Sequence, residues 1–152
     1  VLIIQIPLGM YLVDMDFSEK RLTIENIHVA VGISIFYLTV LRLIYKAFNP
    51  TPKLNNSIFP GQKIIAKLNH VFLYISILMI TISGALKKLY NGEELDMFFF
   101  NLEIQDNFDL AEIFYEIHIL GNYTLIALIS LHIFAVLIHK ILFKENLLKR
   151  IL

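Results

Sequence analysis

Three long apolar segments restrict this chain to a membrane fold. They cover about residues 24–48, 64–89 and 110–143, and each exceeds the roughly 20 residues that an α-helix needs to cross a bilayer. A fourth apolar run, residues 1–13, reaches only about 20 Å, against a hydrocarbon thickness of about 30 Å. We therefore predict an all-α, transmembrane four-helix bundle in one domain, residues 1–152, with its first helix truncated at the N-terminus.

The composition agrees with a lipid environment and narrows the chemistry. Hydrophobic residues make up 57% of the chain and the mean hydropathy is +0.69, whereas soluble domains contain roughly 45–50% apolar residues. The absence of cysteine excludes disulfides, zinc–thiolate sites, iron–sulfur clusters and covalently attached c-type haem. Histidine is the remaining soft metal ligand, at five positions: His28, His70, His118, His132 and His139.

Charged residues are segregated between the two ends of the predicted bundle. The loop after the second span and the C-terminal tail form a basic end with one acid, Glu145, and nine bases: Arg42, Lys46, Lys53, Lys63, Lys67, Lys140, Lys144, Lys149 and Arg150. The other two loops form an acidic end with twelve acids and four bases. Because short cytoplasmic loops carry the excess of Lys and Arg, we expect the basic end and both termini to lie on the cytoplasmic side of the membrane.

His118 and His132 share one predicted helix and one of its faces. Their 14-residue spacing is nearly four helical turns, so both side chains point the same way, about 21 Å apart along the axis. This geometry suits two haems stacked across a membrane, each with one axial imidazole from this helix. His139 lies only about 10 Å from His132, which is too close for another upright haem, and we interpret it as an interfacial residue.

A haem with two histidine ligands needs a second imidazole at the same depth on another helix. His28, near the acidic end of the second span, matches His118 in depth. For His132 two partners remain open, namely His70 on the third span and a histidine on the part of the first helix that precedes Val1. The alternative is that these histidines are hydrogen-bonded residues of a haemless structural or transport bundle. A di-iron bundle is disfavoured, because His-x-x-x-His or Glu-x-x-His motifs do not occur as a pair.

Three segments carry a resemblance to a known family: IHVAVGISI followed by LRLIYKAFNPTP, then LNHVFLYISIL, then IHILGNYTLIALISLHIFAVLIHK followed by KENLLKRIL. Over nearly its whole length the chain resembles the bacterial cytochrome b561 family, which is related to the cytochrome b subunits of nickel–iron hydrogenases and formate dehydrogenases. The resemblance implies two b-type haems held by four histidines. By position, three of these are His28, His118 and His132, and the first-helix ligand falls before Val1.

The resemblance also implies roles for residues at the basic end. It implies that His70 accompanies a quinone-accessible region and does not ligate iron. It matches Arg42 to an arginine that neutralises a haem propionate, and the alternative role of Arg42 is anchoring on the positive side of the membrane. We take Asn69, His70 and His139 as candidates for the quinone end.

The expected function is therefore transmembrane electron transfer through two b-type haems, between a periplasmic redox partner and the membrane quinone pool. The resembled family includes an enzyme that oxidises superoxide and reduces ubiquinone, so the chain is either an oxidoreductase of this type or an electron carrier. At the acidic end, only Lys87 and Lys88 offer an attractive patch for an anionic substrate. The alternative function is the haem b membrane-anchor subunit of a hydrogenase or dehydrogenase complex. Membrane lipid is an expected partner and nucleic acid is not.

Overall fold

A computed structural model describes residues 1–49 and 61–142. The elements in chain order are α1 (Leu2–Val13), α2 (Glu19–Phe48), α3 (Gln62–Tyr90), β1 (Leu95–Asp96), β2 (Asn101–Leu102) and α4 (Phe108–Leu142). The fold is an all-α helical bundle, as predicted. Helices α2, α3 and α4 are long and apolar enough to cross a membrane, whereas α1 is a shorter apolar helix.

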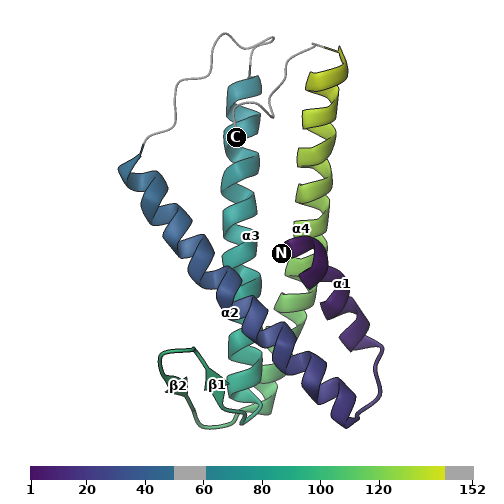
Figure 1. Cartoon of the computed structure of the whole chain (residues 1–152), viewed down its shortest axis with the longest axis vertical. Coiled ribbons are helices and arrows are strands. Elements are labelled where there is room, and N and C mark those ends of the chain that lie inside the picture. The colour runs from purple at the N-terminus through teal and green to yellow at the C-terminus, as the bar shows by residue number, and fades with distance from the viewer. Residues whose placement is uncertain (50–60, 143–152) are drawn as a thin grey trace.

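The four helices differ in how far they pack along the bundle. Helices α3 and α4 run antiparallel, side by side, and form the most extensive contact between any two helices (Figure 1). Helix α2 crosses α3 obliquely near the acidic end and diverges from it towards the basic end (Figure 1). Helix α1 packs against α2 and extends from about mid-height towards the acidic end. All four helices therefore come together in the acidic half of the bundle.

Polar caps fix where two of the spanning helices begin. The Ser18 hydroxyl accepts a hydrogen bond from the Arg21 backbone N–H at 3.2 Å at the start of α2. The Asn107 side chain accepts one from the Leu110 backbone N–H at 3.1 Å at the start of α4. Such caps satisfy first-turn N–H groups that no helix carbonyl reaches. Both helices therefore start slightly before the apolar segments that the sequence marks.

The loop between α3 and α4 folds back onto the acidic end. Its two strands pair antiparallel, with Leu95 opposite Leu102. Leu95 is only 1% exposed and packs in a core cluster with Ile33 of α2 and Leu89 of α3. The Tyr37 hydroxyl donates a hydrogen bond to the Met97 carbonyl at 3.1 Å. This β1–β2 hairpin, which the sequence does not predict, ties the acidic loop to the bundle.

Many large apolar side chains point away from the bundle. Ile3 and Phe48, for example, are 88% and 81% exposed. Such a surface is unfavourable in water and is what the hydrocarbon core of a bilayer covers.

Candidate functional site

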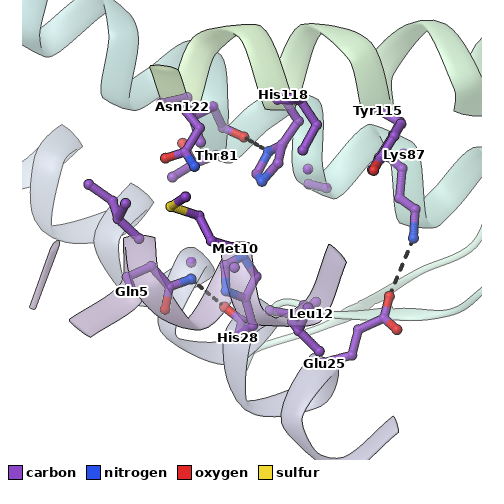
Figure 2. Close-up of a pocket in the computed structure, with 18 of the residues that line it drawn as sticks. Gln5, Met10, Leu12, Glu25, His28, Thr81, Lys87, Tyr115, His118 and Asn122 are labelled. Carbon is purple, nitrogen blue, oxygen red and sulfur yellow. Dashed lines mark hydrogen bonds and ion pairs between the residues drawn. The ribbon is translucent and has the colours of Figure 1, made fainter. Parts of the chain in front are cut away.

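A cavity of about 620 Å³ lies in the acidic half of the bundle, lined by residues from all four helices. His28 of α2 and His118 of α4 project into it from opposite sides (Figure 2). Their ring centroids are 6.2 Å apart and their planes are inclined at 76°. The structure thus brings together the two histidines that depth matching pairs in the sequence. The volume lies within the roughly 300–1,000 Å³ range of small-molecule and cofactor sites.

The spacing of these two rings fits axial ligands of a single metal. A metal–imidazole bond is about 2.0 Å long and the ring centre lies about 1.1 Å behind its nitrogen, so two imidazoles on opposite sides of one metal place their centroids about 6 Å apart. The observed 6.2 Å agrees with that separation. The residues present therefore fit a haem iron between His28 and His118.

The His118 ring is held in the orientation that a ligand requires. Its Nδ1 lies 2.9 Å from the backbone carbonyl oxygen of Ile80 on α3. Because a carbonyl only accepts, Nδ1 carries the proton in this contact and Nε2 keeps its lone pair for a metal. Metal-binding histidines commonly use their other ring nitrogen in this way.

The His28 ring has a different environment. Its Nδ1 is buried and has no hydrogen-bond partner among the described residues, as is also true of Gln5 Oε1. The Gln5 amide nitrogen donates a hydrogen bond to the His28 backbone carbonyl at 2.8 Å, which attaches α1 to α2 beside the ring. Buried polar atoms without partners are costly, so this corner of the cavity has unused capacity to bind a polar group.

A glycine on a neighbouring helix makes room for each ring. A Cβ atom at Gly9 of α1 would lie 2.8 Å from His28 Cε1, and one at Gly84 of α3 would lie 2.9 Å from His118 Cε1 and Nδ1. Real Cβ atoms do not approach other atoms this closely. Sequence reasoning missed both glycines and Gln5. The two glycines could have been found from the sequence, because small residues are preferred where membrane helices approach closely.

Two ion pairs lie near the acidic end among the described residues. Lys87 on the cavity wall forms an ion pair with Glu25 at 3.3 Å, and Lys88 pairs with Glu93. Burial of Glu93 disfavours its charged form, but hydrogen bonds from Lys88 and Asn91 outweigh this and hold the pKa of Glu93 below its ordinary value. Both lysines of the expected attractive patch therefore have a carboxylate beside them.

At the basic end, the structure places His70 of α3 next to His132 of α4. Their ring centroids are 5.2 Å apart, with an interplanar angle of 65°. His132 Nδ1 lies 3.2 Å from Asn69 Oδ1, a contact that again leaves Nε2 for a metal. The separation of 5.2 Å is shorter than the roughly 6 Å that two axial imidazoles of one iron adopt. Of the two partners left open for His132, the structure brings His70 close but does not place it at ligand spacing.

Arg42 belongs to neither histidine pair, although its positive charge is close enough to act on His70. Arg42 Nε donates a hydrogen bond to the Tyr74 hydroxyl at 3.0 Å, on the side where α2 faces α3. His139 belongs to α4, but its side chain lies outside the described part of the structure. Within residues 1–49 and 61–142, no group of three or more His, Cys, Asp or Glu side chains is arranged to hold a metal ion. The four described histidine side chains form two pairs, His28–His118 and His70–His132.

Comparisons with known proteins assign the chain to a family. The family model described as prokaryotic cytochrome b561 matches residues 1–152. Cytochrome b561 homolog 2 of Escherichia coli (strain K12) is 25% identical over 149 residues, which cover 95% of this chain and 79% of that protein. The probable superoxide oxidase CybB of Yersinia pestis is 28% identical over 130 residues, which cover 84% of this chain and 74% of that protein. With its spanning helices, the chain belongs to the prokaryotic cytochrome b561 family, as a bacterial membrane b-type cytochrome of electron transfer.

Proposed function

We propose that this chain carries electrons across the bacterial inner membrane between a redox partner at its acidic end and the quinone pool at its basic end, using two b-type haems. The observation that supports this most is the His28–His118 pair, which faces across a cavity at 6.2 Å. When bound, haem b supplies a one-electron iron couple whose potential depends on its axial ligands.

The first haem is assigned to His28 and His118. Each would offer Nε2 to the iron, and the Ile80 carbonyl keeps His118 in the required tautomer. The polar atoms without partners beside His28 and the two glycines that admit the rings support a bound group between α2 and α4.

The second haem is assigned to His132, with Asn69 holding its Nδ1. Following the family resemblance, its other ligand is a first-helix histidine outside this sequence, and Arg42 is the propionate partner. Following the same resemblance, His70 does not ligate iron and is proposed at the quinone end with Asn69 and His139. A histidine there offers both a proton and a hydrogen bond to a quinone.

Removing one ligand at a time tests these assignments. His118→Ala should abolish the b-type absorption and the EPR signal of the acidic-end haem and leave the other haem near full occupancy. His132→Ala should have the reverse effect. His70→Ala should leave the haem content near normal and slow quinone reduction. Loss of both haems in each single variant, or of a haem in the His70 variant, would contradict the pairing.

The partner at the acidic end has two candidates. The name of the Yersinia relative suggests superoxide, but Lys87 and Lys88 are paired with carboxylates and twelve of the sixteen charged residues of this end are acidic. An acidic surface favours a protein partner with a basic docking surface, because opposite charges steer association. A hydrogenase or dehydrogenase subunit is the candidate partner of this class.

Ionic strength distinguishes the two partners. Attraction of superoxide predicts that its oxidation slows as salt rises and that Lys87→Glu and Lys88→Glu reduce the rate. A rate indifferent to salt and to both variants, together with co-purification of a large periplasmic subunit, would favour the anchor function.

A further inference from the structure

A shallow groove of about 410 Å³ lies between α2 and α3, where these helices diverge towards the basic end (Figure 1). It is separate from the histidine cavity and shares no lining residue with it. Its apolar wall is formed by five residues: Leu43, Ala47, Val71, Ile75 and Leu78. The groove lies on the lipid-facing surface of the bundle, since Ala47, Val71 and Ile75 are exposed.

Two cations are held beside this groove by one tyrosine. Arg42 Nε donates to the Tyr74 hydroxyl at 3.0 Å, and Lys46 Nζ lies 5.1 Å from the centroid of the Tyr74 ring. Arg42 and Lys46 are one helical turn apart on α2, so they share a face. The bond to Tyr74 uses one of the five guanidinium N–H donors, and the others remain for a planar, bidentate anion such as a phosphate.

The positive charge of this pair is not neutralised within the described part of the chain. The ion pairs formed there are Lys87–Glu25 and Lys88–Glu93, both near the acidic end. Over the full sequence, the basic end contains a single acid, Glu145. Arg42 and Lys46 therefore form a site whose complement is an anion.

The groove becomes more apolar with depth. Helix α3 runs from the basic end into the membrane, so Val71, Ile75 and Leu78 lie successively deeper, over about 10 Å. The cations lie near the basic end of α2, and Tyr74 is an amphipathic residue of the kind found at headgroup level. A ligand that matches this arrangement has an anionic head and a long apolar tail.

We propose that this groove is a binding site for an anionic phospholipid, with its phosphate on Arg42 and Lys46 and an acyl chain along Val71, Ile75 and Leu78. Basic pockets between helices on the cytoplasmic side of a membrane bind such headgroups. A free phosphate would bind the two cations but would not cover the apolar wall of the groove. The lipid site shares Arg42 with the proposed propionate contact of the basic-end haem, and its test is therefore made at Lys46, which has no part in the haem proposal.

Native mass spectrometry of the haem-loaded protein, in micelles doped with equal amounts of phosphatidylglycerol or phosphatidylcholine, tests the proposal. We expect phosphatidylglycerol to be retained preferentially, and Lys46→Gln to weaken its retention about fivefold, the factor for one cation beside an anionic lipid. Lys67→Gln is the matched control, because Lys67 is an exposed cation on α3 outside the groove. It should retain the lipid normally.

Three outcomes would overturn the site. The first is equal retention of the two lipids, which would mean that only the apolar wall binds. The second is an equal loss in the Lys46 and Lys67 variants, which would mean a diffuse charge effect. The third is displacement of the lipid by millimolar inorganic phosphate. Unchanged haem spectra in Lys46→Gln show that the variant is folded, so a failure of the lipid site would leave the electron-transfer proposal intact.

Discussion

At the scale of single residues, Asn69 connects the two histidines of the basic end. It precedes His70 in the sequence, and its side chain contacts the ring of His132. Sequence reasoning groups Asn69 with His70 as a quinone residue, yet its Oδ1 contacts the ring of His132. An acceptor on Nδ1–H makes an imidazole a stronger donor to its metal. We therefore propose Asn69 as a positioning residue for His132.

Replacing Asn69 should change the potential of the basic-end haem without removing the haem. Loss of a hydrogen bond of about 1 kcal/mol, if it acts mainly on the ferric state, corresponds to about 40 mV for one electron. We expect Asn69→Leu to raise that midpoint potential by this order and Asn69→Asp to lower it, as measured by optical redox titration. Both variants should leave the acidic-end haem unchanged. An unaltered potential in the Leu variant would exclude the positioning role.

At the scale of helices, the two glycines beside the histidines connect packing with ligation. Helix α3 approaches α4 closely enough that Gly84 lies directly under the His118 ring, and α1 presents Gly9 to His28 in the same way. The separation of helices α2 and α4, and hence of the two rings, depends on these contacts.

A methyl group at Gly84 should therefore displace His118. We expect Gly84→Ala to lower the occupancy of the acidic-end haem at least several-fold, because overpacking a tight contact costs about 1–3 kcal/mol. Pyridine haemochrome quantification per protein provides the measurement. Gly32→Ala is the control, since a Cβ there would meet only Gln5 Nε2 at 3.7 Å, an ordinary contact. Equal haem content in the two variants would show that the glycine contact is not required.

The sequence predicts the helices better than it predicts their contacts. Apolar length places α2, α3 and α4 within a few residues, because a bilayer imposes that length. Depth matching also pairs His28 with His118. The β1–β2 hairpin depends on the packing of Leu95 against Ile33 and on the hydrogen bond from Tyr37 to Met97. These contacts join distant segments, and local sequence patterns do not encode them. The role of Asn69 depends likewise on the rotation of α3 against α4.

At the scale of the whole molecule, charge segregation predicts how the bundle is inserted. The basic end should face the cytoplasm, which places the β1–β2 hairpin outside and the histidine cavity in the outer half of the bundle.

Single cysteines can test this orientation, because the natural chain has none. We expect Glu103→Cys, in the acidic loop, to react with a membrane-impermeant maleimide in intact spheroplasts. Lys67→Cys, at the basic end of α3, should react only after the membrane is permeabilised. Both positions are exposed, so the membrane alone should decide their reactivity. The reverse labelling pattern would place the acidic end and its redox partner on the cytoplasmic side.

The 14-residue interval on α4 also bears on how such a protein evolves. One continuous helix fixes the distance between His118 and His132, and no loop contributes to that distance. If His118 and His132 each hold a haem as proposed, the acidic loop and the basic tail can diverge to suit new donors or acceptors, while the electron-transfer step between the haems keeps its length and rate. The same helix α4 would then serve in several respiratory chains, because the choice of partner would depend on the acidic and basic surfaces and not on α4.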